Sequence, residues 1–254
     1  MTVDTSAAPS DVLESTTPDV MMAVALSRLL RDGETVFHGV ASPLPMVAIL
    51  LARATHAPNL VYLNITGSVD PTPAHLPRST VDPELLRGTR SLITLADAFD
   101  LSARGELDTA FLSGVQIDAR GQINMSAIGE YAHPRVRLPG GAGSAFLMST
   151  ANRIVLWRTR HDRRTFVEEL PFVTGSGNVD RVVTPLCVFQ REPNSGLLRV
   201  ESIHPYSTSK EVAAQTGFRV EVDGTPVTPP PTEEEWTALK AIDPTGVRRT
   251  EFGG

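Results

Sequence analysis

The amino-terminal quarter of the chain alternates between two kinds of apolar segment, and this alternation is the strongest constraint on the fold. Residues 19–31 place Val, Met and Leu at helical spacing, with Pro18 at the start and Gly33 just past the end. A strand, a second helix and a second strand follow at residues 35–40, 43–55 and 59–66. An order of helix, strand, helix, strand predicts a parallel sheet covered by helices.

The rest of the chain adds further elements to this scheme. Strand patterns occur at residues 109–118, 122–128, 153–157, 166–170, 181–190, 197–203 and 219–222. Helical patterns occur at residues 91–104, 144–151 and 209–217, and Thr232 can cap an acidic helix near the end. A turn at residues 118–121 makes two of the strands a hairpin, so the sheet is mixed. We therefore expect an α/β fold: an open mixed, mostly parallel sheet with helices on both faces.

The chain has 254 residues, which is enough for one large α/β domain without covalent cross-links. We expect a flexible arm at residues 1–18, one domain at residues 19–228 and a tail at residues 229–254. The polar arm lacks the apolar core of a secretion signal, and no apolar run reaches the roughly 20 residues of a membrane span. The single cysteine, Cys187, excludes an intrachain disulfide and lies in an apolar strand pattern. A reducing cytoplasm is the expected location.

Charge and histidine spacing narrow the function classes. The net charge of −6 gives no global attraction to nucleic acid, so an anionic ligand would need a local basic or amide-rich site. The histidines His38, His75 and His204 lack the spacing of a zinc site. We expect no metal and no nucleic-acid partner.

A long proline-containing loop at residues 67–83 directly follows a core strand. Long loops are often functional, and ligands collect at the carboxyl ends of parallel strands. Asn64, Thr66 and Gly67 at this strand end are therefore candidate binding residues. A purely structural role at the strand end is equally compatible with Asn64 and Thr66.

A second candidate site is the glycine-rich stretch before the helix at residue 144. Gly140, Gly141 and Gly143 let the backbone adopt positive φ, so that the N–H groups of residues 140–143, Ala142 included, can converge on an oxyanion or a phosphate. A plain glycine turn is the alternative. Arg135, just upstream, can bind a carboxylate or ketone, or it can belong to a solvated or interface strand.

The order of motifs within residues 114–144 carries a family resemblance. Gln-Ile-Asp, Arg-Gly and Ile-Asn are followed by Arg-Leu-Pro-Gly-Gly-Ala-Gly. This order resembles the β-type subunit of family I coenzyme A (CoA) transferases of the glutaconate CoA-transferase type, whose fold belongs to the wider NagB/RpiA-type superfamily. The resemblance implies a CoA thioester as substrate, no bound cofactor, and an α-type partner subunit in a heterotetramer with two copies of each chain.

One departure from that family affects the expected reaction. Acyl-exchanging members carry a nucleophilic glutamate in a Ser-Glu-Asn-Gly-like motif at the end of an early strand. Here Asn64 is nearest the glutamate position, and no carboxylate occurs before Asp70. An amide cannot form the acyl-anhydride intermediate.

Hydrolysis is therefore the expected reaction. The chain also resembles the B subunits of Ipd-type hydrolases, which implies cleavage of a ring carbon–carbon bond in a steroid-derived, indene-type acyl-CoA during cholesterol catabolism. The general base would then lie on the α-type partner. The alternatives are an acyl-CoA:carboxylate CoA-transferase subunit, a non-catalytic scaffold subunit, and a sugar-phosphate isomerase or sensor of the same superfamily.

Overall fold

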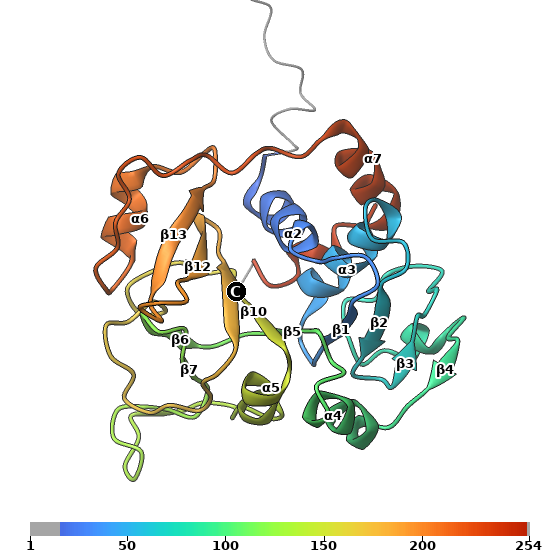
Figure 1. Ribbon diagram of the computed structural model, residues 1–254, viewed down its shortest axis with the longest axis horizontal. Helices are drawn as coiled ribbons and strands as arrows, with labels where there is room; N and C mark the ends of the chain where they lie inside the picture. The colour runs from blue at the N-terminus through green and yellow to red at the C-terminus, as the bar shows by residue number, and fades with distance from the viewer. Residues whose placement is uncertain (1–15, 253–254) are drawn as a thin grey trace, which may run out of the picture.

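A computed structural model describes residues 16–252, which form one large twisted sheet covered on both faces (Figure 1). The strand order is β13-β12-β11-β10-β5-β1-β2-β3-β4. The central strands are parallel: β1 (Thr35–His38), β2 (Val61–Asn64), β5 (Thr109–Leu112), β10 (Arg153–Trp157) and β11 (Val179–Val183). Antiparallel pairs form both edges: β12 (Cys187–Arg191) with β13 (Leu198–Ile203), and β3 (Ser68–Val69) with β4 (Ser91–Leu92). The predicted open, mixed, mostly parallel sheet is confirmed.

Helices cover both faces of the sheet, as expected. One face carries α2 (Pro18–Arg28), α3 (Pro43–Ala54) and α7 (Glu233–Ile242). The other carries α4 (Leu95–Ala103), α5 (Ser144–Thr150), α6 (Ser209–Gln215) and the small pair β6 (Gln116–Ile117) with β7 (Ile123–Asn124). Alternate residues of each strand serve the two faces. Val36 of β1 packs with the α2–α3 layer, and its neighbour Phe37 packs with the opposite layer.

Three strand predictions differ from the structure. Residues 181–190 were expected to form one strand, but they divide into β11 and β12 at a turn that contains Pro185, which has no N–H to donate to a strand ladder. Residues 166–170 contribute only an isolated bridge at Phe166. Residues 219–222, all within the described chain, are irregular, so β13 forms the sheet edge.

The predicted hairpin at residues 109–128 is displaced. Its first segment breaks near Gly114, where a Cβ would lie 2.9 Å from the carbonyl oxygen of Gln116. As a result β5 joins the main sheet, and the hairpin consists of β6 and β7 only. A second small hairpin pairs β8 (Ala127–Ile128) with β9 (Val136–Arg137).

The last helical segments fold back on the first helix. Thr232 caps α7 with a reciprocal bond to Glu235, and Glu235 also pairs with Arg28 of α2 at 2.6 Å. Short 3-10 turns lie at η1 (Pro83–Leu86) and η2 (Val247–Arg249), and Arg248 of η2 is 2.8 Å from Asp19. Most of the predicted amino-terminal arm, residues 1–15, lies outside the described residues. Within the described part, no helix is long and apolar enough to cross a membrane.

Candidate functional site

A topological switch point lies at the carboxyl ends of β1 and β5. The chain leaves β1 toward α3 on one face, and it leaves β5, the neighbouring strand, toward β6 on the other face. Such a switch point is where open α/β sheets bind ligands. The turn at residues 39–42 lies there: Val40 is 55% exposed, and Ala41 has φ +49°.

This β1–α3 turn presents backbone donors. The N–H groups of Val40, Ala41 and Ser42 have no acceptor within residues 16–252. The helix that follows begins with Pro43 and Pro45, neither of which has an N–H. Successive free N–H groups at the amino end of a helix attract an anion or an oxyanion. Sequence reasoning missed this turn, although a helix-opening proline after a strand is a recognisable signal.

The end of β2 carries the predicted residues Asn64, Thr66 and Gly67. Asn64 is 2% exposed; it accepts from the Thr66 N–H at 2.9 Å, and its amide donates to Ser68 Oγ at 2.6 Å. The Thr66 hydroxyl also donates to Asn64. The side chain of Asn64 therefore organises the turn after β2. Substrate binding by Asn64 and Thr66 stays a prediction.

Neither candidate for the glutamate position is a carboxylate. When the glycine of the Ser-Glu-Asn-Gly motif is matched with Gly67, the glutamate falls on Ile65, one residue after Asn64. Ile65 is half-buried and packs against the core of the α4–α5 layer. The next carboxylate along the chain, Asp70, is buried, accepts from the Tyr62 N–H at 2.9 Å and lies 3.3 Å from Arg53. Neither alignment therefore places a carboxylate at the end of β2, and the loss of the family nucleophile stays a prediction.

The glycine loop at residues 140–143 also presents free amides. The N–H groups of Gly141, Ala142 and Gly143 have no acceptor among the described residues. Gly140 has φ +93° and Ala142 has φ +42°, so the direction of the backbone changes at each. A Cβ on Gly143 would lie 2.5 Å from Phe99 Cζ, so packing requires a glycine there. The predicted positive φ is seen at Gly140 but not at Gly141 or at Gly143, whose φ is −76°, and their binding of CoA stays a prediction.

Helix α4 connects the two candidate regions. The Ile93 N–H, two residues before α4, donates to the Gly67 carbonyl at 2.8 Å. Phe99 of the same helix lies against Gly143 and is 5.7 Å from Phe146 of α5 between ring centroids. The end of β2 therefore contacts the segment just before α4, and the glycine loop contacts α4 itself. Arg135 lies apart from these contacts on the exposed β8–β9 hairpin, and it has no ion-pair partner within the described residues.

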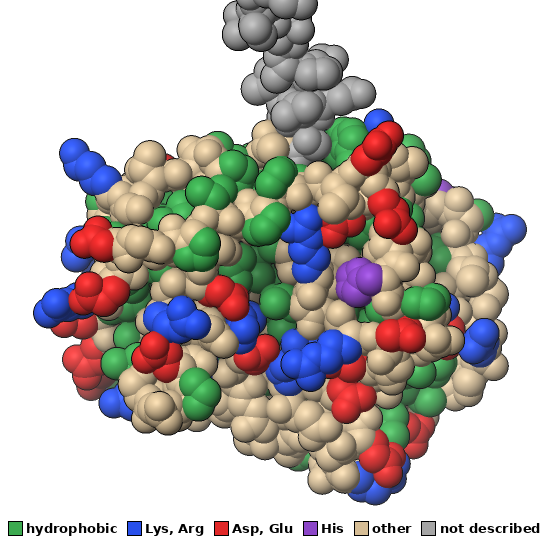
Figure 2. Space-filling model, turned by 45° about the horizontal axis from the view of Figure 1, so that its top comes forward, with side chains coloured by type: hydrophobic (Ala, Val, Ile, Leu, Met, Phe, Trp, Pro, Cys, Tyr) green, Lys and Arg blue, Asp and Glu red, His purple; other side chains and the backbone are tan. Residues whose placement is uncertain are grey.

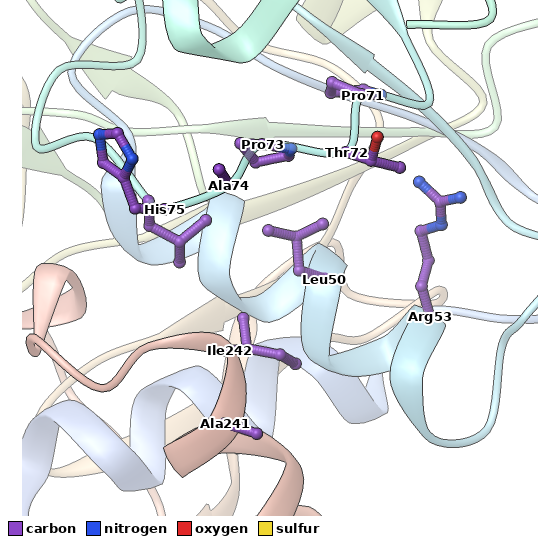
Figure 3. A pocket seen from close by; sticks show the side chains of 10 residues that line it. Leu50, Arg53, Pro71, Thr72, Pro73, Ala74, His75, Ala241 and Ile242 are labelled. Atoms are coloured by element: carbon purple, nitrogen blue, oxygen red, sulfur yellow. The ribbon is translucent and has the colours of Figure 1, made fainter. Parts of the chain in front are cut away.

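A cleft of about 290 Å³ lies elsewhere, between α3, the loop at residues 71–76 and the end of α7 (Figure 3). Two of its polar side chains are those of Arg53, which is paired with Asp70, and of His75 at the other end (Figure 3). The face shown in Figure 2 mixes acidic and basic side chains and has no field of one sign. No group of three or more His, Cys, Asp or Glu residues within the described chain could hold a metal ion.

The topology and the free amides define a class: an open α/β protein that presents unpaired backbone N–H groups in the β1–α3 turn and in the loop before α5. A family model described as coenzyme A transferase matches residues 20–215. The chain belongs to the coenzyme A transferase family, as its glycine signature predicted.

Known proteins of this family differ in their reactions. The chain is 32% identical over 241 residues to the B subunit of 3-oxoadipate CoA-transferase from Pseudomonas knackmussii, covering 88% of this chain and 92% of that protein. It is 29% identical over 248 residues to the cholesterol ring-cleaving hydrolase IpdB subunit of Mycobacterium tuberculosis, covering 91% and 96%. In solved structures, it resembles the decarboxylase AibA/AibB with a TM-score of 0.88 and 38% identity, covering 94% of this chain and 100% of that one. These relatives are subunits of two-component proteins.

Proposed function

We propose that this chain is the B-type subunit of an enzyme that cleaves a carbon–carbon bond in an acyl-CoA, without an acyl bond to this chain. The observation that carries the proposal is the end of β2. Asn64 is occupied by hydrogen bonds to Thr66 and Ser68, and Ile65 has no reactive group. Acyl exchange requires a nucleophile, whereas carbon–carbon cleavage requires a site that stabilises negative charge on oxygen.

The free amides support that second requirement. Loss of CO₂ from a carboxylate on the carbon next to the thioester carbonyl, or on the carbon conjugated with it through a double bond, breaks a C–C bond and leaves the electron pair on that carbon. The pair delocalises onto the thioester oxygen as an enolate, and the carbon then takes up a proton. The N–H groups at residues 40–42 and 141–143 are donors of the kind that stabilise such an oxygen. CoA enters this reaction as part of the substrate.

Two reactions fall within this class. Decarboxylation comes first, because the likeness to AibA/AibB is the stronger one, with 38% identity over 94% of the chain. Ring-opening hydrolysis of a steroid-derived acyl-CoA comes second and is supported by 29% identity to the IpdB subunit. There water adds to a ring ketone, and the bond to the neighbouring carbon breaks. We place the general base for that step on the A-type partner.

The assembly that we propose is a cytoplasmic heterotetramer with two A-type and two B-type chains. The names of its relatives as subunits support a heteromeric enzyme. On this proposal the isolated chain is inactive. Measurable turnover by this chain without its partner would contradict the assignment of the general base to the A-type subunit.

One experiment separates the reactions. The co-expressed complex is incubated in H₂¹⁸O with two acyl-CoA substrates, one bearing a carboxylate on the CH₂ group next to a double bond that is conjugated with the thioester, and one bearing a ring ketone. Release of CO₂ without ¹⁸O in the acyl product supports decarboxylation, and ¹⁸O in a newly formed carboxylate supports ring opening. Borohydride trapping of a modified glutamate on this chain, together with acyl exchange onto a free carboxylate, would establish a CoA-transferase and overturn the proposal.

The scaffold alternative predicts a different pattern. If this chain only supports the A-type partner, substitution of Gly141 changes the amount of assembled complex but leaves turnover per complex unchanged. On our proposal Gly141→Ala lowers turnover per assembled complex, because a Cβ there would lie 2.5 Å from Thr174 Cγ2 and displace the loop amides.

A further inference from the structure

A buried histidine lies behind the β1–α3 turn and has no place in the chemistry described so far. His38, the last residue of β1, is 0% exposed and is held on both ring nitrogens. Its Nδ1 is 2.8 Å from Ser42 Oγ, and its Nε2 is 2.5 Å from the Tyr62 hydroxyl. The Ser42 hydroxyl in turn lies 2.5 Å from the Gly39 carbonyl oxygen. These groups form a continuous chain of hydrogen bonds from β2 to the turn.

The proton positions in this chain follow from the acceptors. A carbonyl oxygen has no hydrogen, so the Ser42 hydroxyl must donate to Gly39. Ser42 has only one proton, and therefore it can only accept from His38 Nδ1, which carries the imidazole hydrogen. His38 Nε2 is then an acceptor, and the Tyr62 hydroxyl donates to it. Every bond thus runs in one direction, from Tyr62 through His38 and Ser42 to Gly39.

This chain of hydrogen bonds lies beside the end of β2, and the loop at residues 67–83 supports it. The nearby Asn64 amide opposes the rise that burial causes in the pKa of Tyr62. His38 and Asn64 are also register partners on adjacent strands. Thr80 of the 67–83 loop donates to the Gly39 carbonyl at 3.2 Å. The Gly39 carbonyl is therefore fixed from three directions, counting the His38 Nδ1 contact at 3.1 Å.

The turn needs such support. Ala41 has φ +49°, a left-handed conformation that costs a non-glycine residue about 1–2 kcal/mol. Strained backbone of this kind persists where its surroundings hold it in place. The adjacent N–H groups at residues 40–42 have no acceptor among the described residues that could fix them. The buried hydrogen bonds to Gly39 are the contacts available to hold them.

We infer that His38 and Tyr62 are positioning residues, which hold the Gly39–Ser42 turn so that its free N–H groups meet the thioester oxygen of the substrate. The oxygen contact rests on the proposed function, whereas the support of the turn does not. The two parts therefore have separate tests. Tyr62→Phe and Ser42→Ala each remove a hydroxyl from one end of this chain of hydrogen bonds, with little change in side-chain volume. His204→Asn is the matched control, since His204 is also 0% exposed and bonded on both nitrogens, to Thr228 and Thr184.

The first test measures amide hydrogen exchange in the assembled complex. In Tyr62→Phe and Ser42→Ala we expect exchange in the peptide spanning residues 42–47, in which the Met46 N–H donates to the Ser42 carbonyl of the turn at 3.1 Å, to accelerate about tenfold, the effect of losing one buried hydrogen bond. His204→Asn should leave that peptide within about twofold of the parent. The positioning role is overturned if amide exchange accelerates equally in the His204→Asn control, or if it accelerates in neither Tyr62→Phe nor Ser42→Ala. If one of the two variants does not fold, the other decides.

The second test compares binding of acetyl-CoA with that of S-ethyl-CoA, which lacks the carbonyl oxygen. The parent complex should prefer acetyl-CoA about tenfold, and Tyr62→Phe should reduce the preference below about threefold. A preference retained in Tyr62→Phe despite faster exchange overturns the link between the turn and substrate. A parent complex that does not distinguish the two ligands contradicts the proposed oxygen contact, while the exchange result still decides whether His38 and Tyr62 hold the turn.

Discussion

The carbonyl oxygen of Ile93 occupies the space in which a side chain at position 67 would begin. A Cβ on Gly67 would lie 2.3 Å from that oxygen, and the Ile93 N–H donates to the Gly67 carbonyl at 2.8 Å. Glycine at this position therefore allows the end of β2 and the start of α4 to touch. The contact places the candidate site on rigid elements.

Gly67→Ala should consequently destabilise the protein strongly. The backbone at Gly67 has φ +86°, and the clash is with a backbone atom that cannot rotate away. We expect a loss of at least about 3 kcal/mol in unfolding free energy, measured by urea denaturation. Gly33→Ala is the control, because Gly33 has a similar φ of +81° with no atom within 4 Å of the added carbon. It should cost about 1 kcal/mol, and equal losses in both variants would contradict the clash.

The glycine loop allows a rescue experiment. Gly143→Ala places a carbon 2.5 Å from Phe99 Cζ and should displace the loop, lowering turnover of the assembled complex about tenfold or more. Phe99→Leu in the same chain removes the obstructing ring edge and should restore most of the activity. Turnover that stays low in the double variant, with Phe99→Leu alone active, would show that Gly143 is required for another reason.

A buried ion pair at the opposite end of the strands tests core electrostatics. Arg153 Nη2 of β10 lies 2.7 Å from Glu34 Oε2, with both side chains nearly buried. Removal of one partner leaves an uncompensated charge, so Arg153→Met and Glu34→Gln should each cost about 3 kcal/mol in unfolding free energy. The double variant should cost less than the sum by at least about 1 kcal/mol. Strict additivity in this cycle would mean that the pair does not interact in solution.

Stability should fall as the pH falls below neutrality. Burial lowers the pKa of His38, His161 and His204 from 6.5 to about 4. Between these values the unfolded chain binds protons that the folded chain does not, so stability declines from about pH 6.5 to about pH 4, by up to about 1.4 kcal/mol per pH unit for each histidine. Burial raises the pKa of Glu251 from 4.5 to about 8. The stability that its protonated carboxyl contributes to the folded protein is therefore lost as the pH rises through this range.

Thermal melting of the complex at several pH values checks this expectation. In His204→Asn the melting temperature should fall less steeply between pH 6.5 and pH 4 than in the parent, because unfolding then takes up about one proton fewer. An identical slope in both proteins would exclude His204 as one of the titrating groups.

Cys187 should be chemically inert in the folded protein. It is 0% exposed, and burial raises the pKa of its thiol to about 12. Reaction with a thiol reagent at pH 8 should therefore be at least about a hundredfold slower in the native complex than in urea. Rapid labelling without denaturant would contradict the buried setting.

The sequence predicted the elements whose boundaries depend on local chemistry. The helix at residues 43–55 is found as Pro43–Ala54, because proline opens it and the apolar run sets its length. The strand at residues 153–157 is found as predicted, and the Thr232 cap of α7 forms. The strand predicted at residues 219–222 fails because apolar alternation does not specify a pairing partner.

The candidate site was only partly predictable. The glycine loop has a recognisable composition, and the positive φ of Gly140 was expected, whereas that of Ala142 was not. The β1–α3 turn has only the signal of a helix-opening proline after a strand, and nothing in the sequence indicates that Ala41 adopts a left-handed conformation. The bonds between His38 and Tyr62 join residues 24 apart in the chain, and strand register alone brings them together.

The ion pairs between the first helix and the last segments also constrain how the protein is made. Asp19 meets Arg248, and Arg28 meets Glu235, across separations of more than 200 residues. During synthesis from the amino terminus, α2 therefore emerges from the ribosome long before its charged partners exist. The layer that contains α2 can be completed only after the segment that carries Glu235 and Arg248 has also emerged. A partner that binds the finished layer can therefore dock only after that point of synthesis.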